Sequence, residues 1–310
     1  MAAKTLTFND TQQGNELLNA VGFQVKGVQL EEGNLEAALT ANKVGDALFL
    51  HIKNNRRLLF SGGRLPGHTP LCFSLGDGCY FHGSQTCGRG LDLCGFKTDK
   101  TDTNVHWAGQ LCGTFLPTKK LQGYLYDKGM FDALERMDRI NKLQLSLNGT
   151  LTLQRLFGRG LRGEIKDHER VYGAVSLMLE DPDSLEGECN PKFDRELRMI
   201  VSMAHEQARS EPMVLDEVLM ALGLKLTQKR TLQQKCREAY GMGITQLMKR
   251  VRMEEARLSI LKDGLNVAGT VRRHVFVDTK QFSKDYKRVF GCNPSFDVSR
   301  AYPRLKLKDA

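Results

Sequence analysis

The spacing of apolar residues changes near residue 125, and this change constrains the fold more than any other feature. Before it, short apolar or alternating segments such as residues 23–30, 47–52 and 71–75 are separated by Gly, Asn and Asp clusters. This pattern is typical of antiparallel strands joined by turns. Of the 30 glycines, 22 lie in residues 1–163, and glycine permits the positive φ angles of tight turns. The sequence therefore predicts a sheet-rich, barrel-like domain over residues 1–124.

After residue 125 apolar residues recur every three or four positions, which is typical of amphipathic helices. We expect a helical segment over residues 125–209, serving as a linker or a dimerisation element. The boundary to the next domain lies at Ser210-Glu211-Pro212. The fold class predicted for the whole chain is α+β, with an all-α domain at the C-terminus.

The C-terminal domain contains one long apolar stripe over residues 244–261, which ends before Gly264. A pair of shorter stripes lies on each side of it. Two short helices on either side of a long one suggest two helix-turn-helix units over residues 210–300. Residues 301–310 then form a basic tail.

The net charge of +9 is confined to this domain. Residues 211–310 hold 20 Lys and Arg against 11 Asp and Glu, whereas residues 1–210 are neutral overall. A basic field restricted to one domain suits a nucleic-acid backbone, because each neutralised phosphate releases a counterion. A soluble basic surface without a partner is the alternative explanation of the charge alone.

Residues 266–295 carry a specific pattern of aromatic and small residues. Nine spaced positions resemble the second helix-turn-helix of AraC/XylS-type transcription regulators: Phe276, Asp278, Phe282, Tyr286, Lys287, Phe290, Gly291, Pro294 and Ser295. Residues 247–261 resemble the linker helix of that family in Arg252, Glu254, Ala256 and Arg257. Residues 230–233 and 240–244 resemble the end of its first unit. The resemblance covers about residues 212–300 and implies a DNA-binding regulator, more often an activator than a repressor.

The chain departs from the family pattern in the second unit. The glycine that the family places before Phe276 is Val275, its following serine is Val277, and a small residue of the preceding helix is Val271. These changes predict a different packing angle between the two helices. In the first unit the turn over residues 223–232 is longer than in the family, and we expect Thr227 to cap the recognition helix.

A helix that enters the major groove presents side chains to base edges, and Arg, Lys and Gln can bond to them. In the first unit we expect Gln228, Lys229, Arg230, Gln233 and Gln234 to face bases. In the second unit we expect Thr279, Lys280, Gln281 and Lys284 to do so. We assign Lys235, Arg237, Lys287 and Arg288 to phosphates, which position a protein without specifying sequence. For each of these side chains, a solvated helix surface is the alternative.

The remaining expectations concern partners and location. No apolar run reaches the ~18 residues of a membrane span, and no secretory signal is visible, so we expect a cytoplasmic protein. The expected partner is double-stranded DNA. The resemblance further implies a sensing or dimerising N-terminal domain, and hence a small-molecule effector, a homodimer and contact with RNA polymerase. No cofactor is expected.

Cysteines in the N-terminal half leave a second class of function open. Cys72, Cys79, Cys87 and Cys94 are almost evenly spaced, and Cys112 follows. Thiolates could bind metal or sense redox state, with DNA binding as the readout, or the half could be an enzyme. However, the C-x₂₋₄-C pairs typical of zinc sites are missing, and no trio of acid, base and nucleophile stands out. Buried thiols, without catalysis, are the preferred interpretation.

Overall fold

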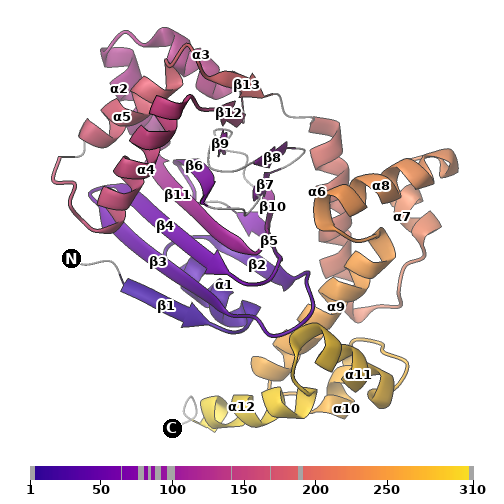
Figure 1. Ribbon diagram of the computed structural model, residues 1–310. Coiled ribbons are helices and arrows are strands. Elements are labelled where there is room, and N and C mark those ends of the chain that lie inside the picture. The colour runs from indigo at the N-terminus through magenta and orange to yellow at the C-terminus, as the bar shows by residue number, and fades with distance from the viewer. Residues whose placement is uncertain are drawn as a thin grey trace.

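The computed structural model describes residues 4–63, 65–75, 80–82, 85–87, 92–95, 102–140, 142–167, 169–187 and 191–306. Figure 1 shows these residues as a succession of layers. Helices within residues 118–179 cover a large sheet, a smaller sheet lies next to it, and the C-terminal helices lie beyond the smaller sheet. Four hydrophobic clusters fill these layers.

The larger sheet has the order β1-β3-β4-β11-β6-β9-β12-β13. Its strands are β1 (Lys4–Phe8), β3 (Ala37–Val44), β4 (Ala47–Asn54), β6 (His68–Leu75), β9 (Asp92–Cys94), β11 (Gly109–Pro117), β12 (Lys142–Gln144) and β13 (Leu185–Gly187). All the pairings are antiparallel.

The smaller sheet has the order β2-β5-β10-β7-β8. Its strands are β2 (Gln24–Gln29), β5 (Leu58–Gly63), β10 (Asp102–His106), β7 (Tyr80–His82) and β8 (Gln85–Cys87). The described strands thus form two open sheets, and the barrel-like closure predicted from the sequence is not formed. Helix α1 (Thr11–Ala20), which the apolar pattern does not predict, is capped by Asp10, whose side chain accepts from the Gln13 amide.

Alternation along the strands separates two cores on the faces of the larger sheet. On β11, Leu111 and Phe115 point between the two sheets, whereas Cys112 and Leu116 point towards the helices of residues 118–179. Successive side chains of a strand face opposite sides, so each central strand contributes to both cores. The strands predicted at residues 47–52, 71–75 and 111–116 are confirmed.

Helices α2 (Thr118–Asp127), α3 (Phe131–Arg139), α4 (Leu147–Leu161) and α5 (Glu169–Leu179) cover the outer face of the larger sheet. The close approach of α4 requires Gly160, because a Cβ atom there would lie 2.3 Å from the Phe49 ring. Helices α3, α4 and α5 lie in the segment predicted to be helical over residues 125–209, whereas α2 begins before it and the short strands β12 and β13 interrupt it.

The outer face of the smaller sheet packs against the C-terminal helices. Val28, Leu59 and Val105 from three of its strands share one core with α6 (Pro191–Glu206) and the first helix-turn-helix unit. A short 3₁₀ turn, η1 (Gln207–Arg209), follows α6. Helix α6 therefore packs with the C-terminal helical domain, although it precedes the boundary expected at Ser210.

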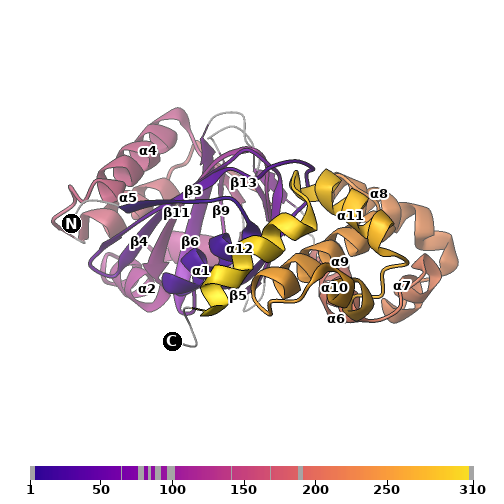
Figure 2. The same ribbon diagram turned by 90° about the horizontal axis from the view of Figure 1, so that it is seen from below.

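The remaining helices are α7 (Leu215–Ala221), the 3₁₀ turn η2 (Leu226–Gln228), α8 (Lys229–Tyr240), α9 (Ile244–Leu261), α10 (Val267–Arg273), α11 (Thr279–Phe290) and α12 (Pro294–Lys306). Helix α9 has the bounds that the sequence predicts. Helix α12 extends into the expected basic tail and lies beside α1, where Arg300 pairs with Asp10 at 2.7 Å (Figure 2).

Candidate nucleic-acid interface

Two helix-turn-helix units are formed by α7 with α8 and by α10 with α11. Helix α9 joins them and contributes to the core of both, through Leu247 and Val251 on one side and Ala256 and Ile260 on the other. The fully buried stripes on α9 therefore fix the two recognition helices, α8 and α11, relative to each other.

The beginnings of the two recognition helices differ. Asp278 caps α11 as the sequence predicts, since its carboxylate accepts from the Gln281 amide at 2.7 Å. The cap expected at Thr227 is wrong, because Thr227 lies inside the 3₁₀ turn that leads directly into α8. At that turn the Gln228 side chain accepts from the Lys225 amide at 3.0 Å. The extra residues of the longer turn form a further helical turn.

The two recognition helices end alike. Gly241 after α8 has a φ of 74° and Gly291 after α11 has a φ of 75°. Both adopt the left-handed conformation that ends many helices and that glycine adopts without a Cβ clash.

Aromatic side chains form the core of the second unit. Phe276, Phe282, Tyr286 and Phe290 follow one another, with ring centroids 4.8, 5.5 and 4.7 Å apart. Phe282 and Tyr286 are fully buried. The inward stripe predicted on this helix is confirmed.

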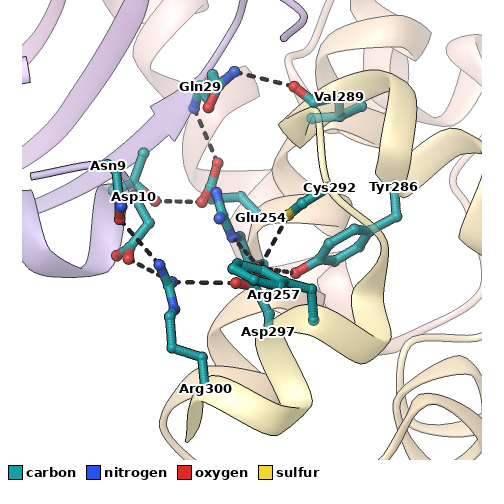
Figure 3. Close-up of polar contacts among 12 residues, drawn as sticks. Asn9, Asp10, Gln29, Glu254, Arg257, Tyr286, Val289, Cys292, Asp297 and Arg300 are labelled. Carbon is teal, nitrogen blue, oxygen red and sulfur yellow. Dashed lines mark hydrogen bonds and ion pairs between the residues drawn. The ribbon is translucent and has the colours of Figure 1, made fainter. Parts of the chain in front are cut away.

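A buried polar network lies beneath these rings (Figure 3). Arg257 of α9 bonds to Asp297 of α12 at 2.8 Å, and the Tyr286 hydroxyl donates to the same carboxylate at 2.6 Å. Burial opposes the charge of Arg257, yet Tyr286, Asp297 and Glu254 together raise its guanidinium pKa. The network therefore joins α9, α11 and α12. Its buried charges, on Arg257 and Asp297, compensate each other.

Val275 stands where the resembled family has glycine, and its backbone keeps the conformation suited to glycine. Its φ is 52°, the only positive value among the described residues other than glycine. A β-branched residue is strained there, because its Cβ approaches the following carbonyl. The substitution thus leaves strain in the turn between α10 and α11.

Most of the side chains assigned to bases lie exposed on the two recognition helices. Lys229, Arg230 and Gln234 are exposed on α8, and Thr279, Lys280, Gln281 and Lys284 are exposed on α11. Gln228 is half-buried at the start of α8. Arg237, Lys287 and Arg288, assigned to phosphates, are also exposed. The helical rows thus bring together the cationic and amide groups that groove recognition uses.

Two of the predicted side chains point elsewhere. The Gln233 side chain accepts from the Ile244 amide at 3.2 Å and so satisfies the start of α9. Lys235 is half-buried and pairs with Glu196 of α6 at 3.0 Å. Both are occupied by contacts within the protein, which helical spacing alone does not reveal.

The N-terminal domain contacts the ends of both recognition helices, a feature that the sequence does not predict. The Arg57 guanidinium, stacked 3.7 Å from the Trp107 ring centroid, donates to the Tyr240 carbonyl of α8 at 3.2 Å. Gln29 donates to the Val289 carbonyl of α11 at 3.0 Å. These residues are about 180 to 260 positions apart in sequence, so no local signal could identify the contacts.

Most of the described cysteines are free, buried thiols, as the preferred interpretation expects. Cys112 and Cys236 are free and buried, and burial raises the pKa of Cys236 to about 12. Burial and the neighbouring Cys72 also raise the pKa of Cys112, which opposes formation of a reactive thiolate. Cys94 is disulfide-bonded, contrary to the expectation of thiols. The side chains of Cys79 and Cys87 lie outside the described residues.

Among the described residues, no group of three or more His, Cys, Asp and Glu side chains could hold a metal ion. The described helices likewise include none that is long and apolar enough to cross a membrane.

An apolar cavity of about 60 Å³ lies between the two sheets. Phe23, Phe60 and Phe115 line it together with aliphatic side chains, and Asn104 and His106 add polar groups. Burial lowers the pKa of His106 to about 3, so the imidazole is neutral. The space is several times the ~10–15 Å³ that one water needs.

Comparisons with known proteins agree with this geometry. Residues 226–297 match a family model described as a helix-turn-helix domain, of the AraC type. A comparison with curated proteins finds no match.

Similar solved structures include the AraC-like transcriptional activator CuxR, with 14% identity and a TM-score of 0.43 over 83% of this chain and 96% of that chain. A probable AraC family transcriptional regulator from Rhodopseudomonas palustris CGA009 has 22% identity and a TM-score of 0.31, over 34% and 97% of the two chains. ToxT from Vibrio cholerae O395 has 11% identity and a TM-score of 0.31, over 90% and 97%. These similarities are too distant to carry a functional argument.

The match over residues 226–297 runs from η2 to the first turn of α12 and includes both recognition helices and the linker helix between them. Residues 226–297 therefore form a helix-turn-helix domain of the AraC type, a fold that binds DNA.

Proposed function

We propose that this protein activates transcription from a specific DNA site and that a small molecule bound in the N-terminal domain controls it. The observation that carries the DNA-binding part is the pair of exposed polar rows on α8 and α11, held by α9. Recognition helices of helix-turn-helix proteins lie in the major groove, and two units bound to one side of DNA lie about one turn, ~34 Å, apart.

The bases are read by Gln228, Lys229, Arg230 and Gln234 of the first unit and by Thr279, Lys280, Gln281 and Lys284 of the second. Arg237, Lys287 and Arg288 contact phosphates. Gln233 and Lys235 act as positioning residues, since their side chains hold α8 against α9 and α6. All of these base-reading residues except Gln228, which is half-buried, are exposed.

DNA binding by the full chain tests this proposal. We expect tighter binding to DNA upstream of its own coding region than to a random duplex of equal length. With about six phosphate contacts, affinity should fall ~10³-fold or more between roughly 50 and 200 mM salt. Equal affinity for both duplexes would indicate a structural nucleic-acid protein without sequence preference, and a flat salt response would contradict the phosphate contacts.

The cavity between the sheets is the proposed effector site. Its lining is mostly apolar, and the neutral His106 and Asn104 contribute polar groups. It therefore suits a small, uncharged, largely apolar molecule with one polar group. In such pockets the apolar lining buries the ligand and the few polar groups fix its orientation. β2 lines this cavity through Val25 and reaches α9 and α11 through Gln29, which supports control of DNA binding from the cavity.

Thermal unfolding with a panel of small apolar alcohols and amides tests the effector site. A ligand of the cavity should raise the melting temperature and change DNA affinity, because it binds only the folded state. Cys72→Leu should place a larger side chain in the cavity and abolish both effects, whereas Cys236→Ser, outside the cavity, should keep them. Retention of both effects in Cys72→Leu would place the ligand elsewhere.

Activation rests on the family resemblance alone. Transcription in vitro with purified RNA polymerase should increase when the protein is added to a template carrying its site; a decrease would identify a repressor. Polymerase contact, a homodimer and a cytoplasmic location stay predictions, which crosslinking, mass measurement and fractionation can check.

A further inference from the structure

The loop between β2 and β3 reaches the C-terminal end of the second recognition helix. The Gly33 amide and the Gln29 side chain both donate to the Val289 carbonyl, each at 3.0 Å (Figure 3 shows the Gln29 bond). Val289 lies in the last turn of α11, where carbonyls lack partners within the helix. The loop is therefore seated on α11 by the main chain, and a glycine with a φ of 104° makes the approach.

Seating the loop places one acidic side chain between two arginines. Glu32 Oε1 lies 3.2 Å from Arg288 Nε and 3.2 Å from Arg250 Nη2. The Arg250 side chain is only 5% exposed, whereas the Arg288 side chain is 56% exposed. Glu32 thus compensates a buried charge on one side and occupies a solvent-facing guanidinium on the other.

That guanidinium belongs to the exposed cationic row of α11. Lys280, Lys284 and Arg288 are four residues apart, all exposed, and therefore lie on the same side of the helix. If this side faces the DNA backbone, a phosphate and the Glu32 carboxylate would bind the same guanidinium. Carboxylate and phosphate are both bound by arginine through similar hydrogen bonds.

We propose that Glu32 competes with DNA phosphate for Arg288, so that the seated loop is an autoinhibitory contact of the second recognition helix. This inference rests on the proposed contact of α11 with DNA. Binding to DNA exchanges Glu32 for a phosphate at Arg288, while Arg250 keeps its carboxylate partner. Because β2 ends in this loop and also lines the cavity between the sheets, the contact lies where an effector could strengthen or weaken it.

The test compares Glu32→Gln with Glu36→Gln in the full chain. Both remove one negative charge from the same exposed loop, but the Glu36 side chain has no ion pair in the described part of the chain. Glutamine keeps an acceptor for Arg250, and melting curves of both variants confirm that each is folded. We expect Glu32→Gln to bind a 30-base-pair duplex ~2–5-fold more tightly than the parent at about 50 mM salt, in line with the exchange of an exposed ion pair. The salt slope should steepen by up to about 0.9.

The same pair of substitutions in an Arg288→Gln background completes the experiment. There, Glu32→Gln should give no more gain than Glu36→Gln, because the shared guanidinium is missing. Equal gains for the two glutamine variants in the parent, or a gain that persists without Arg288, would overturn the competition. If Arg288→Gln leaves the parent's affinity unchanged, this inference also fails, whereas sequence-dependent binding by the parent would still support the proposed function.

Discussion

The two helix-turn-helix units share their layout but differ in how they join the rest of the molecule. In the first unit, Leu232, Cys236 and Tyr240 belong to a core that also contains residues of α6 and of the smaller sheet. In the second unit, Phe282, Tyr286 and Phe290 form a core with α9 alone among the preceding elements. Its contacts with the N-terminal domain are polar, through Gln29, Glu32 and Arg300.

This difference indicates which unit can change its contacts. An apolar core shared with the sheet cannot be opened without exposing apolar surface to water, at ~25 cal/mol per Å². Hydrogen bonds and half-exposed ion pairs can be exchanged for water or for phosphate at little net cost. The first unit is thus fixed to the N-terminal domain by an apolar core, whereas the second is held to it by polar contacts that are easier to exchange.

Removing the N-terminal domain gives the largest expected effect. In a fragment of residues 211–310, the first unit loses its packing against α6 and the smaller sheet, where each buried Leu, Ile or Val contributes about 1.5–3 kcal/mol. We expect hydrogen exchange at α8 amides to be at least ~100-fold faster than in the full chain, while α11 stays protected. Equal protection of both helices in the fragment would show that the shared core is dispensable.

Phe282→Ala should damage the second unit instead. The ring is 1% exposed, and its removal leaves a cavity that costs about 3–5 kcal/mol of unfolding free energy. Denaturant unfolding measures the loss, and exchange at α8 should change less than exchange at α11. Phe282→Leu, which fills most of the space, is the control; a Phe282→Ala protein that unfolds like its parent would contradict the burial.

Gln281 and Lys287 separate base reading from positioning within the second unit. Gln281 lies in the first turn of α11, so Gln281→Ala should relax preference at one or two base pairs, by ~1–3 kcal/mol against the correct site. Lys287 lies two turns later, and Lys287→Ala should weaken all sequences alike and lower the salt slope by about one. Titrations on single-base variants of the site measure both. Unchanged base preference and unchanged salt slope would exclude this helix from the groove.

Val275→Gly gives the smallest expected effect, a gain in stability. Glycine should relieve the left-handed strain of ~1–2 kcal/mol. Its greater conformational freedom in the unfolded chain offsets part of this, so the free energy of unfolding should rise by ~1 kcal/mol. Val277→Gly is the control, because Val277 is 98% exposed and has no positive φ, so it should destabilise slightly. A lower melting temperature for Val275→Gly would mean that Val275 packing outweighs the strain.

The sequence by itself determined the features that depend on neighbours along the chain. The bounds of α9, the cap at Asp278, the glycine ends of both recognition helices and the aromatic stripe of α11 all follow from helical spacing and from local hydrogen bonds. The resemblance to AraC/XylS-type regulators is carried by the same positions. Helix α1 was missed because its buried positions include Thr11, Gly14 and Asn15, which give no apolar stripe.

Tertiary structure alone decided which faces are exposed and which elements meet. Helical spacing places Gln233 and Lys235 beside the base-reading side chains, but the packing of α9 and α6 turns them inwards. The two open sheets depend on pairings between strands far apart in sequence, such as β4 with β11. The loop that brings Glu32 to Arg288 depends on contacts between residues more than 200 positions apart. Such contacts depend on how whole layers of secondary structure pack against each other. The local sequence around each residue therefore does not predict them.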